Sequence, residues 1–368
     1  MEPQQQPQPL PPALHIDPPL LNSANPWATT LEDLKALLEC EDTGAVTTRT
    51  ATLEGFPHDD AVHQYTFFTP DGSSNSHGND DAASLNNMGY SPLPLATYLE
   101  FIETLSTTTT TTTTSTSDKT DKKLFIVSVT GTPDATAQAY SLVAQLAHRV
   151  ANPLALEVNL SCPNIPGAPP PAYDARALSA YLEKLSEAAS AEAKRKRIPW
   201  GIKTPPYTTP AQFDVVIEAL LRAAAATATP EGEVCPVSFV TATNTLGSCL
   251  VLEDMVTTTT EGGEKGSNNP PKLPSSTHGL GGMAGPPLHP LALGNVASLR
   301  RRLDASEKTR HVQIIGVGGV GDAAGYRRMR SVGAVAVGVG TALGRKGVAV
   351  FGEIRDGLVG EGEKGESW

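Results

Sequence analysis

The chain has 368 residues, of which 39% are hydrophobic and 18% are charged, and its formal net charge is −11. This acidic balance disfavours binding to the phosphate backbone of a nucleic acid, so no nucleic-acid partner is expected. No stretch reaches the roughly 18 apolar residues of a membrane span, and the N-terminus lacks the basic start and apolar core of a signal peptide. We therefore expect a soluble, cytoplasmic protein with no membrane partner.

One domain is expected between two tails, a Pro/Gln-rich segment at residues 1–14 and a short segment at 359–368. Low-complexity insertions interrupt this domain (15–358) at about residues 70–84, 106–123 and 257–277. Such Thr-, Gly- and Ser-rich segments bury too little apolar surface to offset the entropy of ordering, so they are predicted as mobile loops.

Short apolar runs alternate with helical patterns along the domain. The first helical pattern, at residues 30–40, begins with a capping box of Thr29 and Glu32, and others lie at 141–150 and 175–185. Eight parallel strands joined by crossovers predict a (β/α)8 TIM barrel, with an open doubly wound sheet as the alternative. The predicted strands are residues 19–23, 45–50, 124–129, 154–160, 200–204, 238–243, 312–317 and 334–339.

Polar residues stand where these strands end. Arg49 closes the second strand, Asn159 the fourth, Lys203 the fifth and Asn244 the sixth. In a barrel, the C-terminal ends of all strands meet at one mouth, which is where such folds carry their active sites. Because buried amides and charges are costly without partners, their convergence predicts a site for a polar, largely uncharged heterocycle.

The glycines after the seventh strand have two interpretations. Gly316, Gly318 and Gly321 match the spacing of a dinucleotide-binding loop, but the acidic residue expected about 20 positions later is absent. The alternative is a phosphate site built from backbone N–H groups after strands seven and eight. The cysteines Cys40, Cys162, Cys235 and Cys249 lie too far apart to signal a zinc site or a disulfide framework, so no metal is expected.

The stretch EVNLSCPNIPG at residues 157–167 ends a strand on Cys162. A lone cysteine at such a position is more often an inert core thiol than a reactive group. Here Ser161, Asn159 and Asn164 surround it, and Pro163 cannot extend a strand ladder. This setting favours a role in chemistry.

These residues resemble a known family. NLSCPN-x-PG at 159–167, with AYD at 172–174, is similar to the signature of the soluble, fumarate-dependent (class 1A) dihydroorotate dehydrogenases. The resemblance covers roughly residues 15–355 and separates the chain from the membrane-bound, quinone-using enzymes, which have serine as base. Further matching motifs, in chain order, are TLEDL, TATLEG, NNMG, GIKTPPY, NTLG, GLGG, PLALGNV, IIGVGGV and VGTAL.

The resemblance implies a homodimeric FMN enzyme that oxidises dihydroorotate to orotate in pyrimidine (UMP) biosynthesis, with fumarate as acceptor. Cys162 matches the base that takes the substrate's C5 proton, Ser161 is its nearest assistant, and the C6 hydride passes to flavin N5. The implied substrate contacts are Arg49, Asn86, Met88, Gly89, Asn159, Asn164, Asn244 and Thr245. The implied cofactor contacts are Ser23, Ala24, Arg49, Thr50, Ser128, Asn159, Lys203, Thr245, Gly281, Gly282, Gly318, Gly319, Gly340 and Thr341.

The chain departs from the family pattern near this site. Arg49 stands where the family has lysine, Asn87 where it has serine, and Gly338 where it has glutamine. Two alternatives therefore remain: a related FMN barrel acting on another dihydropyrimidine or acceptor, and a catalytically silent homologue. A dihydrouridine synthase acting on tRNA belongs to the first group, and the net charge of −11 counts against it.

Overall fold

The computed structural model describes residues 10–70, 82–112, 122–161, 170–192, 197–228, 232–253, 256–259, 265–274 and 277–360. Eight parallel strands close into a barrel in the order β1-β14-β13-β8-β7-β6-β5-β2. The closed barrel confirms the predicted fold and excludes the open sheet. Its strands are β1 (Leu20–Asn22), β2 (Ala45–Thr47), β5 (Leu124–Val129), β6 (Leu154–Asn159), β7 (Trp200–Thr204), β8 (Phe239–Ala242), β13 (Gln313–Val317) and β14 (Ala336–Val339).

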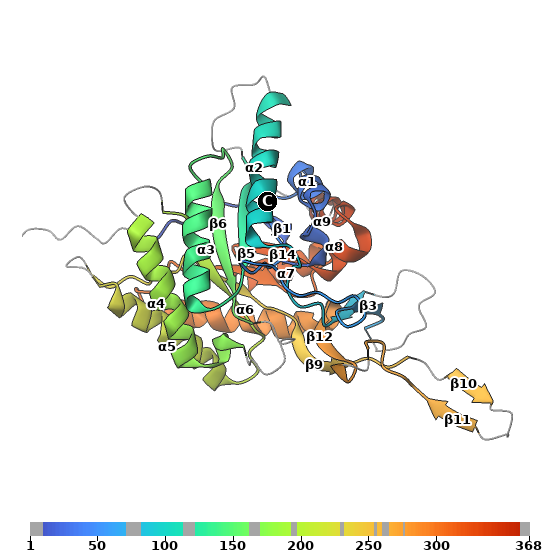
Figure 1. The fold of residues 1–368 in the computed structure, drawn as a ribbon. Helices are drawn as coiled ribbons and strands as arrows, with labels where there is room; N and C mark the ends of the chain where they lie inside the picture. The colour runs from blue at the N-terminus through green and yellow to red at the C-terminus, as the bar shows by residue number, and fades with distance from the viewer. Residues whose placement is uncertain are drawn as a thin grey trace, which may run out of the picture.

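Helices surround the barrel, with α3 and α4 on one side and α1, α8 and α9 on the other in Figure 1. Among the described residues, no helix combines the length and apolar character needed to cross a bilayer. The helices are α1 (Leu31–Glu39), α2 (Leu95–Thr112), α3 (Pro133–Leu146), α4 (Ala175–Ala191), α5 (Pro210–Ala226), α6 (His289–Asp304), α7 (Ala323–Ser331), α8 (Thr341–Lys346) and α9 (Ala349–Gly360). Short 3₁₀ turns are η1 (Pro26–Ala28), η3 (Pro171–Tyr173) and η6 (Pro286–Leu288).

The capping box of α1 lies one residue later than predicted. Thr30 is the N-cap and accepts from the Asp33 N–H, while the Asp33 carboxylate accepts from the Thr30 N–H at 2.9 Å. Thr29 is engaged elsewhere, because its hydroxyl donates to the Pro26 carbonyl at 2.7 Å. The acidic partner is therefore Asp33 instead of Glu32.

A second, antiparallel sheet in the order β3-β4-β12-β9 accompanies the barrel and was not predicted. Its strands are β3 (Tyr65–Phe68), β4 (Ala83–Asn86), β9 (Leu246–Leu250) and β12 (Leu280–Ala284). The first two follow the C-terminal end of β2, and the other two follow that of β8. This sheet therefore stands at the mouth of the barrel where those strands end (Figure 1).

The insertions contain more regular structure than predicted. Helix α2 continues through Thr112, and β10 (Val256–Thr259) pairs with β11 (Lys265–Asn268) as an antiparallel ribbon that projects from the body (Figure 1). Residues 82–84 of the first insertion are described as well, and Ala83 and Ser84 begin β4. Residues 71–81, 113–121, 260–264 and 275–276 of the insertions, and residues 1–9 and 361–368, lie outside the described residues.

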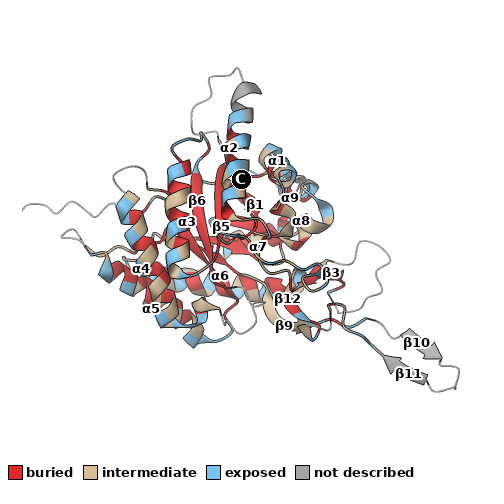
Figure 2. Cartoon of the chain, in the orientation of Figure 1, coloured by how far each residue is buried: buried red, intermediate tan, exposed pale blue. Residues whose placement is uncertain are grey.

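The barrel interior changes character along its axis. Its lower part is an apolar cluster that includes Leu124, Ile126, Ala155 and Phe239. Figure 2 shows the strands β5 and β6 as buried throughout. Residues two apart on a strand face the same side, so the next interior position on β6 after Ala155 is Glu157. Polar groups thus replace apolar ones as the strands approach the mouth.

Candidate active site

A cavity opens at the C-terminal ends of the barrel strands, with about 980 Å³ of atom-free space including open solvent at its mouth. Fifteen of the predicted site residues line it: Ser23, Ala24, Arg49, Thr50, Asn86, Met88, Gly89, Asn159, Lys203, Asn244, Thr245, Gly318, Gly319, Gly340 and Thr341.

Four predicted residues lie behind the wall of the cavity. Ser128 and Ser161 are buried side chains that contact lining residues. The Gly282 carbonyl accepts from Asn86 Nδ2 at 3.2 Å. A Cβ at Gly281 would lie 2.7 Å from the Asn86 carbonyl oxygen, so glycine lets β12 approach β4. The remaining two, Cys162 and Asn164, lie outside the described residues.

An aromatic group at the cavity wall was missed in the sequence. The Trp27 ring stacks on Phe67 at 5.9 Å and meets the edge of Tyr65 at 5.4 Å. Trp27 lies only five residues after the first strand, so its position near the barrel mouth could have been predicted from the sequence. Tyr65 could not have been placed there, because its strand β3 was not predicted. Other lining residues that were missed are Asn25, Pro26, Ser84, Tyr90, Thr243, Ala284, Gly285, Leu288 and Val317.

Lys203 brings a buried positive charge to the cavity. It stands on β7 between Asn159 of β6 and Thr241 of β8, and only 4% of it is exposed. No hydrogen bond or ion pair joins its ammonium group to any residue that the structure describes. Because a buried charge costs several kcal/mol unless it is compensated, this position favours an electron-rich ligand.

The loop after β13 offers free backbone donors at the other side of the cavity. Gly318 and Gly319 have φ values of 142° and 68°, and a Cβ at Gly319 would lie 2.6 Å from the Gly285 carbonyl oxygen. Their N–H groups donate to no backbone carbonyl within the described part of the chain. Successive N–H groups of this kind form concave sites for anions. The closed barrel excludes the Rossmann context that the dinucleotide interpretation of these glycines required.

His289, at the start of α6, holds this glycine loop. Its Nδ1 lies 2.7 Å from the Gly318 carbonyl oxygen, and Arg328 Nε donates to its Nε2 at 3.1 Å. Because Nε2 accepts from Arg328, Nδ1 carries the ring proton and donates to Gly318. No pattern in the sequence singled this histidine out.

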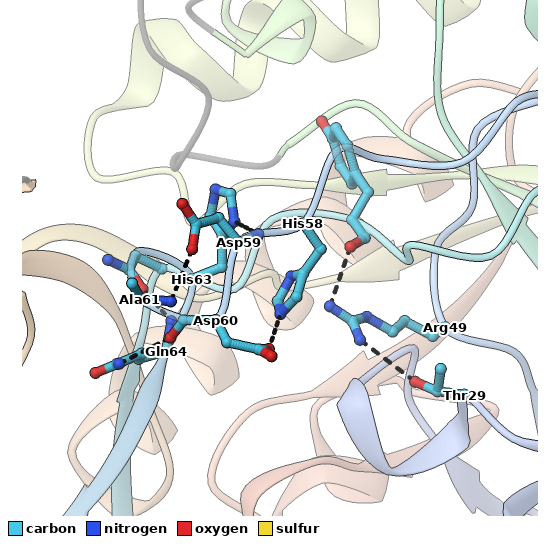
Figure 3. A network of polar contacts seen from close by, with 10 residues as sticks. Thr29, Arg49, His58, Asp59, Asp60, Ala61, His63 and Gln64 are labelled. Carbon is cyan, nitrogen blue, oxygen red and sulfur yellow. Dashed lines mark hydrogen bonds and ion pairs between the residues drawn. The ribbon is translucent and has the colours of Figure 1, made fainter.

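Arg49 connects two segments of the cavity wall (Figure 3). Its guanidinium donates to the Tyr90 carbonyl at 3.0 Å and to the Thr29 hydroxyl at 3.5 Å. Burial lowers the pKa of Arg49 from its ordinary value. The arginine thereby ties the loop after β4 to the turn after β1.

A second loop, residues 56–64, supports the turn at Gly89. A Cβ at Gly89, whose φ is 64°, would lie 2.5 Å from the Phe56 ring, and this ring lies 5.0 Å from His63. His63 Nδ1 accepts from the Asp59 N–H at 2.9 Å (Figure 3). Burial, and then the charge of the neighbouring His58, lowers the pKa of His63.

Three polar side chains form a connected group at the ends of β6 and β8. Asn159 Oδ1 accepts from the Ser161 hydroxyl at 2.9 Å and from Asn244 Nδ2 at 3.3 Å. Asn244 Nδ2 also donates to the Ser161 hydroxyl at 3.0 Å. The Ser161 proton is therefore directed at Asn159.

The family model for dihydroorotate dehydrogenase matches residues 34–361. The chain belongs to the dihydroorotate dehydrogenase family. The predicted family and the prediction of an oxidoreductase are thereby confirmed.

Curated relatives in this family extend over most of the chain. A Trypanosoma brucei protein named dihydroorotate dehydrogenase (fumarate) is 30% identical over 92% of this chain and 88% of its own length. A Streptococcus uberis protein named putative dihydroorotate dehydrogenase A (fumarate) is 30% identical over 94% of this chain and 89% of its own length. The crystal structure of Eimeria tenella DHODH with ferulenol shares the fold, with a TM-score of 0.64, 16% identity, and coverage of 93% of this chain and 81% of that one.

Proposed function

We propose that this protein oxidises dihydroorotate to orotate in the synthesis of UMP, with FMN as bound cofactor and fumarate as electron acceptor. Membership of the family supports the reaction, and the names of the relatives support fumarate. The observation that carries the proposal is the cavity itself, whose wall combines four amide side chains with the buried Lys203, whose ammonium has no partner in the part of the chain that the structure describes. Amides present donors and acceptors together, which the edge of a pyrimidine dione requires.

The residues present fit FMN. The Lys203 ammonium would compensate negative charge on the reduced isoalloxazine, and the N–H groups of Gly318 and Gly319 would hold the phosphate, with Gly340 and Thr341 beside them. Ser23, Ala24 and the other predicted lining residues would contact the remainder. FMN supplies the acceptor for the substrate's hydride when it is bound.

The substrate would lie against the amide side. Asn86, Asn159 and Asn244 line the cavity and would bind the ring, while Met88 and Gly89 provide backbone for the substrate carboxylate. Cys162 would take the C5 proton as base, and Asn164 would complete the ring contacts. These two roles rest on the resemblance. Ser161 would assist indirectly, because its own proton is donated to Asn159.

Assembly and location are part of the same proposal. The resemblance implies a homodimer, and a cytoplasmic enzyme is the expectation from composition. Sedimentation equilibrium of the purified protein tests the dimer, and a mass of one chain would contradict it.

A second candidate is the same chemistry on another dihydropyrimidine. It is favoured by Arg49, which stands where the family has lysine and whose guanidinium donates to Tyr90 and Thr29. A substrate panel under identical conditions separates the two. Faster reduction by dihydrouracil or dihydrothymine than by dihydroorotate would select this candidate.

The proposal is tested with the purified protein and its flavin spectrum. Dihydroorotate added without oxygen should bleach the flavin absorbance, and fumarate should restore it. A colourless protein that gains no flavin spectrum with added FMN, or a flavin that dihydroorotate does not reduce, contradicts the reaction. Restoration by a quinone but not by fumarate contradicts the acceptor alone.

Cysteine variants test the base. Cys162→Ala should slow flavin reduction by roughly 10²–10⁴-fold, the usual contribution of a positioned base, while FMN stays bound. Cys249→Ala is the control, since Cys249 is a free thiol in the same protein that does not line the cavity. Unchanged reduction in Cys162→Ala would assign the base to another residue.

A further inference from the structure

A carboxylate lies inside the barrel directly below the cavity. Glu157 is on β6, two residues before Asn159, so both side chains point into the barrel about 6.6 Å apart along the strand. Only 2% of Glu157 is exposed. It does not line the cavity. Its carboxylate therefore does not contact a ligand in the cavity, and any effect of Glu157 on ligand binding passes through other side chains.

Two hydroxyl groups satisfy this carboxylate. Ser128 Oγ donates to Glu157 Oε1 at 2.9 Å, and Thr241 Oγ1 donates to Oε2 at 2.6 Å. A carboxyl group that accepts at both oxygens has the pattern of the ionised form, which has no donor of its own. Among the described residues, no ion pair joins Glu157 to Lys203, the nearest interior cation along the neighbouring strand.

The carboxylate fixes the direction of a chain of hydrogen bonds. The Ser128 proton is directed at Glu157, so at the 2.9 Å contact between the two hydroxyls Thr50 is the donor and Ser128 the acceptor. The Thr50 oxygen then accepts, and it does so from Asn159 Nδ2 at 3.1 Å. Each step has one direction because an ionised carboxylate can only accept.

The chain ends by orienting an amide of the cavity wall. With Nδ2 donating to Thr50, Asn159 must turn Oδ1 toward Ser161 and Asn244, as the structure shows. Its second N–H has no partner among the described residues, and Asn159 lines the cavity. A donor is thereby presented to the ligand. The Ser161 backbone N–H supports the same orientation by donating to Oδ1 at 3.2 Å. The opposite orientation would present a carbonyl oxygen and break four hydrogen bonds.

We propose that Glu157 is a positioning residue for substrate binding: through Ser128 and Thr50 it holds Asn159 with an N–H toward the carbonyl oxygens of the pyrimidine ring. The identity of the ligand in this inference rests on the proposed function. The direction of the hydrogen bonds from Asn159 to Glu157 does not, because it depends on the protein's own residues alone.

A pair of variants separates positioning from stability. Ser128→Ala cuts the chain between Glu157 and Thr50, whereas Thr241→Val removes the other hydroxyl from the same carboxylate and leaves the chain intact. Thr241→Val removes one buried side-chain hydrogen bond and Ser128→Ala removes two, so both should lower the Tm. Steady-state kinetics with dihydroorotate and titration of the flavin spectrum with orotate then compare the FMN-loaded proteins.

Ser128→Ala should raise the KM for dihydroorotate and the Kd for orotate on the order of tenfold. Thr241→Val should stay within about twofold of the unaltered protein in both constants. Equal increases in both variants, or no increase in Ser128→Ala, would overturn the proposal and leave Glu157 a structural residue.

Coupling to Glu157 is measured in the same assays. Glu157→Gln has the same shape but can donate as well as accept, so it no longer dictates one direction. It should raise the KM when made alone and add less than about twofold when made in the Ser128→Ala protein. Full additivity of the two changes would overturn the proposal.

Neutron diffraction from a deuterated crystal decides the direction of the chain without any substrate. The Thr50 deuteron should point at Ser128, and the Ser128 deuteron at Glu157. A Thr50 deuteron pointing at Asn159 would overturn the proposal. If the unaltered protein binds no orotate while the deuterons lie as expected, the proposed function fails and the positioning chain stands.

Discussion

The guanidinium of Arg49 and the carbonyl oxygen of Tyr90 lie 3.0 Å apart, and this hydrogen bond joins the end of β2 to the loop that carries Met88 and Gly89. A second bond, to the Thr29 hydroxyl, fixes the same side chain from the opposite side. A planar fork can serve both acceptors at once, whereas an ammonium group is a single compact charge. Arg49 therefore holds the Tyr90 loop and the Thr29 turn together, which the family's lysine could not do with the same geometry.

Arg49→Lys tests this use. We expect the KM for dihydroorotate to rise on the order of tenfold, because a single ammonium group cannot keep both charge-assisted hydrogen bonds, to the Tyr90 carbonyl and to the Thr29 hydroxyl. Arg49→Ala should raise it further, since it leaves the Tyr90 carbonyl without this donor and removes the bond to Thr29 as well. Initial rates over a range of substrate give the constants. Unchanged kinetics in both variants would show that the loop keeps its position without Arg49.

Lys203 should have opposite effects on stability and on cofactor binding. It should lower the free energy of unfolding of the FMN-free protein and raise the affinity for FMN. Lys203→Met removes a buried charge that has no partner among the described residues, so we expect the free energy of unfolding of the FMN-free protein to rise by about 1–3 kcal/mol. FMN affinity should fall in the same variant. Denaturant unfolding and flavin titration measure the two effects. Lys35→Met, in an exposed ion pair, is the control and should change stability by less than about 1 kcal/mol. A loss of stability in Lys203→Met would indicate a compensating partner.

His289 should control retention of the cofactor phosphate. His289→Ala frees the Gly318 carbonyl and loosens the glycine loop, so the Kd for FMN should rise on the order of tenfold. His311→Ala is a matched control, because His311 also faces a carbonyl, that of Cys235, but lies outside the cavity lining. An equal loss of FMN in both variants would point to general destabilisation.

The loop at residues 56–64 should weaken in acid. The lowered pKa of His63 means that the unfolded chain takes up a proton below about pH 6.5 while the folded chain resists it. Stability is therefore undiminished above this pH and falls as the pH drops through the window below it. His63→Gln keeps an acceptor for the Asp59 N–H and cannot titrate. Thermal unfolding between pH 5 and 8 should show a shallower acid decline in this variant, and parallel profiles would contradict the prediction.

The barrel could be predicted because each of its strands is a short apolar run whose periodicity is local. The cavity followed from it, since the ends of parallel strands meet at one mouth. The sheet of β3, β4, β9 and β12 could not, because its strands are short, partly polar and paired with distant segments. Glu157 was visible as a charge within an apolar strand, but its partners depend on the register between β5, β6 and β8. The roles of Cys162 and Asn164 stay predictions.

The pairing of Asn86 with Gly282 joins two segments that are 196 residues apart in the chain. During synthesis on the ribosome, β4 emerges long before β12. The part of the cavity wall that β4 forms therefore lacks its pairing strand while most of the barrel strands are still being synthesised. A chain cut short before β12 would have β4 without that neighbour. Tight flavin binding would then report that translation and folding have both reached the last third of the protein.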